Sequence, residues 1–176
     1  MKKKLLGLGL IVILFSSCSV GYKLTGNYPI TGESVLIDKT FEEVWSKTID
    51  YFALNGVPIS TIDKSSGLIV SSKMDLTNSY SRESNGELLN PKAYVVIPTV
   101  RGGFGNILEP TSAITGNWDM IGDFNVRIKN TDSNNILVNV NLLNLNCFYS
   151  AGRSTVKIPI STTGVFEKEM IKYLSE

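Results

Sequence analysis

Residues 40–72 read "TFEEVWSKTIDYFALNGVPISTIDKSSGLIVSS", a complete helix pattern followed by a hairpin pattern. Thr40 can cap the helix, and Glu43 three residues later completes a capping box. Hydrophobic and small residues then recur at the three- and four-residue spacing of a single helix face. These inward positions are Phe41, Val44, Trp45, Thr48, Ile49 and Phe52. Gly56 suits the left-handed position that ends a helix, and Pro58 prevents its continuation.

The surroundings of this helix extend the pattern in both directions. We expect Trp45 to be its main core contact rather than a platform for a ligand. The two β-rich runs after the helix flank Asp63–Gly67, whose residues are typical of a hairpin turn. The short apolar run Val35–Ile37, before the helix, predicts a first strand. The chain therefore begins its folded part as β-α-β-β.

The C-terminal half is regular. Residues 124–129 alternate apolar and polar, which predicts a half-buried strand. Residues 138–147 alternate as well, but the phase slips, which predicts a β-bulge near Leu142–Leu143 with Leu143, Leu145 and Cys147 continuing the apolar face. Val156, Ile158 and Ile160 predict a last strand, and residues 162–176 a closing helix. The inward residues of that helix are Phe166, Met170, Tyr173 and Leu174.

The middle of the chain carries weaker signals. Residues 75–91 have few large apolar side chains and no clear period, which predicts a mobile loop. Residues 93–98, "AYVVIP", predict one strand. Residues 100–118 contain four glycines but lack the Gly-Lys-Ser/Thr of a phosphate-binding loop, so a flexible loop is the better interpretation. The order β-α-β-β-…-β-α predicts an α+β domain, an antiparallel sheet with an N-terminal and a C-terminal helix packed on one face.

The N-terminus is typical of a secretory signal peptide. Lys2–Lys4 are followed by the apolar run Leu5–Phe15 and by the small residues Ser16 and Ser17. A transmembrane helix needs about 20 apolar residues, and this run is clearly shorter. A cleaved leader is therefore a better interpretation than a permanent span.

Cys18 directly follows the small residues, and this segment resembles the lipobox of bacterial lipoproteins. Ser17 fits that pattern, whereas Phe15 stands where the family usually has leucine. The resemblance implies that the Cys18 thiol is acylated and that Cys18 becomes the first residue of the mature chain. The alternative is a conventional signal peptide cut nearby, which leaves Cys18 as an ordinary thiol.

We expect three segments: a lipoprotein signal peptide at 1–17, the lipidated Cys18 with a tether at 18–33, and one α+β domain at 34–176. Residues 19–32 have no period and contain Gly, Asn and Pro, which is typical of a flexible linker. A linker of this length has a mean span of roughly 20 Å. The domain should therefore stay close to the membrane.

The composition excludes several classes of function. The leader holds three of the 17 basic residues and none of the 16 acidic residues, so the mature chain has a formal charge of −2 and no basic stripe for nucleic acid. Because the chain has no histidine, Ser-His-Asp and Cys-His hydrolysis and histidine-containing zinc sites are excluded. No cofactor or metal site is predicted. Cys147, within an apolar strand pattern, is expected to be a small buried core residue.

Two polar patterns have both functional and structural interpretations. The asparagines at 139, 141, 144 and 146 form either a hydrogen-bonding face for glycan or peptide, or a solvated sheet face, which we favour. Asp119 and Asp123, four residues apart, would share one face of a strand. Paired carboxylates can perform acid-base chemistry. An ordinary turn explains them equally well, so an enzyme is the weakest of the functional hypotheses.

The stretch 40–72 resembles a helix-grip-like module of envelope lipoproteins, such as the repeated domains of BamC in the outer-membrane barrel-assembly machinery. The matching residues are Phe41, Val44, Trp45, Asp63, Gly67, Leu68 and Val70. The match covers this stretch alone, and the chain shows no second copy. The resemblance implies a non-enzymatic interaction domain, with another envelope protein as its candidate partner.

The leading hypothesis is accordingly a membrane-anchored, non-enzymatic envelope lipoprotein that serves as an interaction or scaffold domain. The alternative is a lipid-anchored carrier with an apolar cavity of several hundred Å³ between the sheet and the C-terminal helix. Ser19 follows Cys18 where inner-membrane lipoproteins carry aspartate, and residues 19–22 lack the acids of surface-directed lipoproteins. These resemblances imply an outer-membrane location, facing the periplasm, in an organism with two membranes.

Overall fold

The computed structural model describes residues 23–29, 32–99, 116–131, 135–151 and 153–176. These residues form the predicted α+β fold, with two helices and sheets that are mainly antiparallel. In chain order the elements are β1 (Glu33–Ile37), α1 (Phe41–Leu54), β2 (Ile59–Asp63), β3 (Leu68–Ser71), β4 (Met74–Asp75), β5 (Tyr80–Ser84), β6 (Glu87–Leu88), β7 (Val95–Ile97), β8 (Gly116–Asn130), β9 (Ile136–Ala151), β10 (Ser154–Ile158), β11 (Ser161–Thr162) and α2 (Val165–Ser175).

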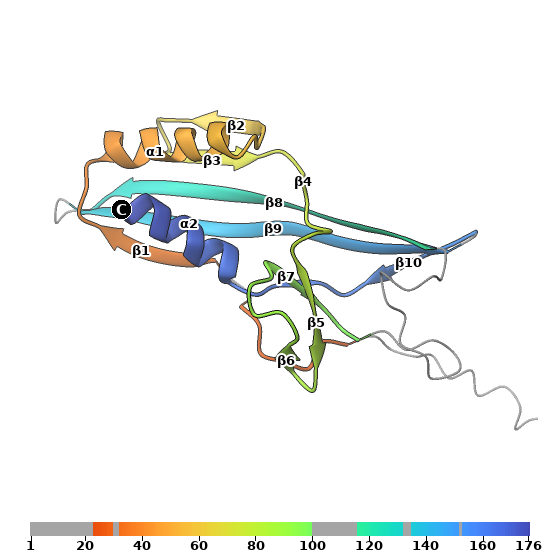
Figure 1. Ribbon diagram of the computed structural model, residues 1–176. Helices are drawn as coiled ribbons and strands as arrows, with labels where there is room; N and C mark the ends of the chain where they lie inside the picture. Colours follow the sequence, from red (N-terminus) through yellow and green to blue (C-terminus); the bar gives the residue numbers. More distant parts are fainter. Residues whose placement is uncertain (1–22, 30–31, 100–115, 132–134, 152) are drawn as a thin grey trace, which may run out of the picture.

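The large sheet is built around β8 and β9, which pair antiparallel along almost their whole length (Figure 1). Its main strand order is β1-β9-β8-β3-β2, with β4 added beside β8 and β10 beside β9. All of these pairings are antiparallel. The hairpin β2–β3 turns at Gly67, whose φ of +68° and close approach to the Ile128 carbonyl require glycine.

Both helices cover the same face of this sheet, as predicted, and they also contact each other. The capping box of α1 is present, with the Thr40 side chain and Glu43 bonded reciprocally. Trp45 is 8% exposed and stacks on Phe41, which confirms its role as a core contact. Phe124 of β8 lies at the centre, with ring centroids 4.8 Å from both Phe52 of α1 and Phe166 of α2.

The β-bulge in β9 is real but lies slightly later than predicted. Asp123 pairs with Leu143 and Ile121 with Asn146, so two residues of β9 face the single residue Gly122. Asn144 has a φ of +50° there, and a Cβ at Gly122 would lie 2.7 Å from the Leu145 side chain. The shift places Leu143 on the outer face, where it is 37% exposed, instead of on the apolar face.

The last predicted strand is partly wrong. β10 ends at Ile158, before Pro159, and Ile160 lies outside it. Ile158 is buried beside Cys147, but Val156 is 42% exposed. The final helix is confirmed but begins at Val165, because Thr162 belongs to β11. Its predicted inward residues are correct, with Phe166, Met170 and Leu174 buried and Tyr173 packed against the core.

The predicted mobile loop at 75–91 is wrong, because these residues contribute to a second sheet of strand order β11-β7-β5-β6. In this small sheet β5 pairs parallel with β7, and β6 folds back antiparallel on β5. Asn85 and Gly86 form the two-residue turn with φ values of +54° and +85°, the geometry that an Asn-Gly hairpin uses. The predicted strand at 93–98 is confirmed as β7, with Val95, Val96 and Ile97 fully buried.

The glycine-rich stretch 100–118 lies almost entirely outside the described residues. Its last three residues, 116–118, are the start of β8.

Candidate functional site

The predicted lipidation site, Cys18, lies outside the described residues, as does the whole predicted leader. The described part of the chain begins at Lys23, two residues before Thr25. Thr25 itself follows Cys18 by seven residues. Residues 23–29 run along the small sheet (Figure 1).

The first feature of the site is a buried carboxylate, Glu83 on β5, that binds the N-terminal segment. The Thr25 amide donates to Oε1 at 2.6 Å and the Thr25 hydroxyl to the same oxygen at 2.9 Å. The Gly26 amide and the Tyr28 hydroxyl donate to Oε2 at 2.9 and 2.8 Å. Glu83 is only 4% exposed, and these four hydrogen bonds satisfy both of its oxygens.

These contacts shift the pKa values of both partners. Burial alone raises the pKa of Glu83, but the hydrogen bonds from Gly26, Thr25 and Tyr28 outweigh it and leave the net pKa below its ordinary value. Burial, followed by the hydrogen bond and charge of Glu83, raises the pKa of Tyr28 to about 12. Glu83 is therefore ionised and Tyr28 neutral near neutral pH, which is the pairing that these bonds need.

The same segment makes close backbone contacts beyond Glu83. A Cβ at Gly26 would lie 2.5 Å from the Gly86 carbonyl, and a Cβ at Gly32 would lie 1.9 Å from the Val140 carbonyl. The Gly32 amide also donates to Asn141 Oδ1 at 2.9 Å. We call residues 25–29 together with Gly32 the strap, because they join the small sheet to β9 of the large sheet.

The strap corrects the predicted tether of residues 18–33. The second half of the predicted tether is bound to the domain, and Glu33 is already part of β1. The sequence concealed this, since residues 19–32 have no periodicity and Glu83 lies 58 residues away from Thr25. The signal available in the sequence was the Asn-Gly pair after Glu83, which is typical of a hairpin turn.

A second buried carboxylate, Glu167 in the first turn of α2, was also missed by the sequence reasoning. It is 1% exposed. It accepts from the Thr162 hydroxyl at 3.0 Å and from the Leu142 amide at 3.3 Å. β1 pairs with β9 before Leu142, and β10 pairs with β9 after it. Glu167 therefore accepts a hydrogen bond from a β9 amide in the gap between these two neighbouring strands. It links β11 of the small sheet to β9 of the large one.

The asparagine row bonds mostly within the protein. Asn141 donates to Asn125 Oδ1 at 2.8 Å and Asn139 donates to Ser34 Oγ at 2.6 Å. Asn144 donates to Asp123 Oδ2 at 2.8 Å, beside the bulge. Asn146 donates to the Asn144 carbonyl at 2.8 Å. These partners favour a structural role, in which the amides hold the outer face, the strap and the bulge in place.

The predicted carboxylate pair does not form a catalytic pair. Asp119 and Asp123 lie on the same face of β8, opposite Phe148 and Leu143. Four residues along a strand correspond to about 13 Å, too far for the two groups to share a proton or a substrate atom. Asp123 is bound to Asn144, and its other oxygen has no hydrogen-bond partner in the described part of the chain.

Cys147 is a free and fully buried cysteine, as predicted. Burial, and secondarily the negative charge of Asp119, raise the pKa of its thiol to about 12. The thiolate is the nucleophilic form, so this residue is protected from reaction in the folded protein.

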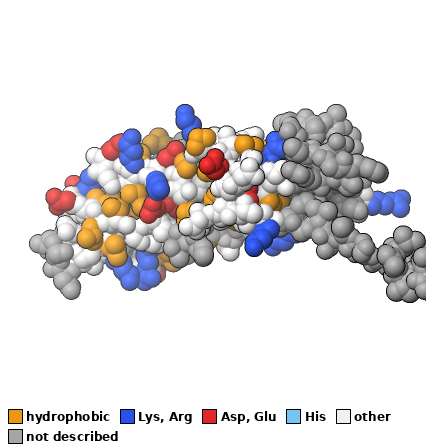
Figure 2. Space-filling model, turned by 90° about the horizontal axis from the view of Figure 1, so that it is seen from below, with side chains coloured by type: hydrophobic (Ala, Val, Ile, Leu, Met, Phe, Trp, Pro, Cys, Tyr) orange, Lys and Arg blue, Asp and Glu red, His pale blue; other side chains and the backbone are white. Residues whose placement is uncertain are grey.

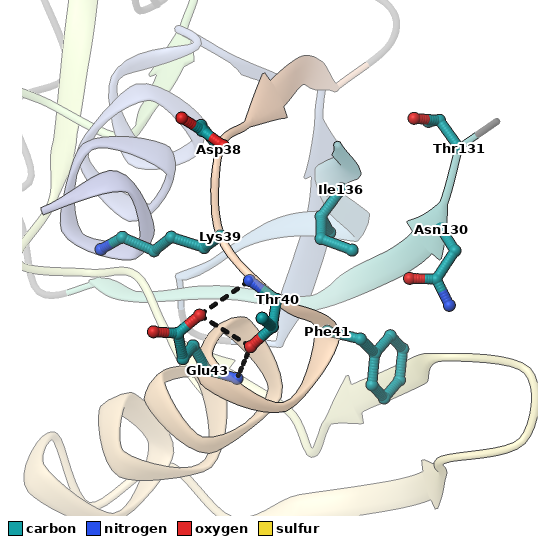
Figure 3. Close-up of a pocket in the computed structure, with 8 residues that line it drawn as sticks. All are labelled: Asp38, Lys39, Thr40, Phe41, Glu43, Asn130, Thr131 and Ile136. Atoms are coloured by element: carbon teal, nitrogen blue, oxygen red, sulfur yellow. Dashed lines mark hydrogen bonds between the residues drawn. The ribbon is translucent and has the colours of Figure 1, made fainter. Parts of the chain in front are cut away.

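A surface pocket of about 550 Å³ lies where α1 begins (Figure 3). Figure 3 shows Asp38, Lys39 and Thr40 on the connection from β1 to α1, with the Asp38 and Lys39 side chains pointing away from Asn130 and Thr131 at the end of β8 and just after it. The capping box uses the Thr40 amide and hydroxyl, Oε2 of Glu43 and the Glu43 amide. These groups of the pocket wall therefore serve the helix terminus.

The described residues show no other arrangement typical of a catalytic or metal centre. No group of three or more histidine, cysteine, aspartate or glutamate side chains among them is placed to hold a metal ion. No helix in the described part of the chain is both long and apolar enough to cross a membrane. Hydrophobic, basic and acidic side chains are interspersed over the side seen in Figure 2.

The comparisons with known proteins give no family. The chain matches no protein-family model, and no curated protein is significantly similar to it.

Proposed function

We propose that this protein is a membrane-anchored envelope lipoprotein whose α+β domain acts by binding another envelope component and not by catalysis. The observation that carries the proposal is the N-terminal segment, with three lysines, an apolar run of 11 residues and the small residues before Cys18. Acylation of Cys18 would hold the mature chain at a membrane, since two or more acyl chains give stable anchoring.

The interior of the domain supports binding over transport of a small ligand. A carrier needs an apolar cavity between the sheet and α2. In the described part of the chain, that space is occupied by Phe124, Phe166, Met170 and Leu174, all at most 3% exposed. No observation favours the carrier alternative.

The edges of the large sheet support a role in protein interactions. Among the described strands, β2 pairs only with β3, and β10 only with β9. Ile62 on β2 is 55% exposed. Unpaired edge strands present backbone donors and acceptors to which a partner can add a strand. A mature formal charge of −2 gives no electrostatic basis for binding nucleic acid.

The proposed location is the outer membrane, with the domain in the periplasm. It rests on Ser19 and on the absence of acids at residues 19–22, as the resemblance to bacterial lipoproteins implies. Protease added to intact cells tests the location. The domain should resist digestion until the outer membrane is permeabilised, whereas digestion of intact cells would contradict a periplasmic domain.

The anchor is tested by Cys18→Ala. Cells grown with labelled palmitate should incorporate the label into the wild-type protein, which should sediment with membranes. The variant should lose the label and become soluble. Cys147→Ala is the matched control and should retain both properties, because Cys147 is buried in the core. Label and membrane association that persist in Cys18→Ala would refute the proposed anchor.

A further inference from the structure

The strap limits how far the domain can lie from the proposed anchor. Cys18 precedes Thr25 by seven residues. A fully extended chain spans at most about 3.6 Å per residue, so the two Cα atoms lie within about 25 Å in any conformation. If β1 were the first fixed point, 15 residues would separate Cys18 from Glu33 and allow about 54 Å.

A reach of this length selects one end of the domain. In Figure 1, β5 and β6 lie at the bottom of the molecule and α1 at the top. Because Thr25 is bonded to Glu83 on β5, the β5–β6 end is the part of the domain that the anchor holds near the membrane.

The β5–β6 end carries an exposed hydrophobic side chain on a fixed backbone. Leu88 pairs with Glu83 across the hairpin, and Glu83 binds the strap, so β6 belongs to the end of the small sheet that the strap holds. Leu89 is 62% exposed, although its amide donates to the Arg82 carbonyl at 3.0 Å. A leucine held outward in this way is suited to insert into the headgroup region of a bilayer.

Exposed residues that follow Leu89 in sequence, together with Lys23 just before the strap, are compatible with a lipid surface. Lys23, Pro91 and Lys92 are exposed, and lysine can extend its amine to phosphate groups while its stem contacts apolar surface. Glu87 at the turn opposes this charge, so the contact depends on Leu89 more than on electrostatics. We propose that Leu89, together with Lys23 and Lys92, docks on the lipid headgroups of the membrane in which Cys18 is anchored. This inference rests on the proposed lipidation of Cys18.

A site-specific label can test the docking in the full-length lipidated protein. Leu89→Cys would be labelled with an environment-sensitive fluorophore, since Cys18 carries the lipid and Cys147 is buried. The protein is then incorporated into vesicles of phosphatidylethanolamine and phosphatidylglycerol that contain a lipid with a nitroxide on its headgroup. Leu54→Cys is the matched control, because Leu54 is 79% exposed on α1. We expect quenching at residue 89 to be at least about threefold stronger than at residue 54.

A second variant tests the strap itself. Glu83→Gln in the Leu89→Cys background keeps the lipid but weakens the bonds to Thr25 and Gly26. Quenching at residue 89 should then fall toward the value at residue 54, while the protein still floats with the vesicles. Circular dichroism would confirm that the variant remains folded.

The outcomes separate the two proposals. Flotation with equal quenching at residues 89 and 54 overturns the docking surface and leaves the anchor intact. Failure of the wild-type protein to float with vesicles overturns the anchor and, with it, the docking. Quenching at residue 89 that is unchanged by Glu83→Gln contradicts the role of the strap.

Discussion

The two sheets of this domain are held by different interactions. The large sheet buries a continuous apolar face under two helices, with Phe124 at its centre. The small sheet buries Val95, Val96 and Ile97, but its outer connections are polar, through Glu83 to the strap and Glu167 to β9. Apolar burial is nearly independent of pH, whereas a buried carboxylate depends on its charge. The two parts should therefore respond differently to mutation and to acid.

The largest loss of stability is expected for a buried residue of α1, which packs on the large sheet. Trp45→Ala removes a buried aromatic ring, which typically costs about 3–5 kcal/mol, a large part of a domain's stability. Leu54→Ala on the same helix is the matched control, since Leu54 is 79% exposed and should change stability by less than about 0.5 kcal/mol. Denaturant unfolding measures both. Similar losses in the two variants would reject the packing of α1 described here.

An intermediate effect is expected at the link between the sheets. Glu167→Ala leaves the Leu142 amide and the Thr162 hydroxyl without their acceptor, at a cost of about 1–3 kcal/mol. Glu169→Ala, two residues later, removes an exposed acid bonded only to the Tyr94 hydroxyl and should cost less than about 1 kcal/mol. Equal costs would show that burial of Glu167 contributes nothing to the junction.

A smaller effect, with a distinct pH dependence, is expected at the strap. The pKa of Glu83 is below its unfolded value, so its contribution to stability is present above the unfolded pKa and is lost as the pH falls through the folded pKa. Glu83→Gln should lower the free energy of unfolding by about 1–2 kcal/mol at neutral pH. The difference between wild type and variant should shrink as the solution becomes strongly acidic. A difference that stays constant with pH would mean that the charge of Glu83 is not involved.

The smallest effect is expected for the reaction rate of the Cys147 thiol, which reports on the opening of the large sheet. Cys147 should react with a thiol reagent only when β8 and β9 open, because its thiol is buried and its pKa is raised to about 12. In a Cys18→Ser background, Glu83→Gln should increase this rate far less than Trp45→Ala does, because its cost in stability is smaller. Equal increases in the two variants would show that the two sheets open together.

The same contrast explains what could be predicted from the sequence. α1, the β2–β3 hairpin, the second half of β8 and α2 follow repeating apolar patterns, and each of them was predicted. The first residues of β8, 116–118, were predicted to be part of a loop. The bulge was predicted from its phase slip and misplaced by one or two residues, because Asn144 rather than Leu142 takes the left-handed conformation. The α+β class followed from these elements alone.

The small sheet could not be predicted in this way. β5 and β6 are short, and the buried face of β5 consists of Ser81 and Glu83, so no apolar alternation marks them. The Asn85–Gly86 turn was visible in the sequence and was not used. The partners of Glu83 and Glu167 lie far away along the chain, and only the fold brings them together.

The claim that the strap fastens the small sheet through Glu83 is tested most directly by amide hydrogen exchange. Exchange would be compared between the wild-type protein and Glu83→Gln at neutral pH, at the amides of Thr25, Gly26 and β5, and in β8 and β9. The account predicts that the variant loses much more protection at Thr25, Gly26 and β5 than in β8 and β9. Unchanged protection at Thr25 and Gly26, or an equal loss throughout β8 and β9, would contradict it.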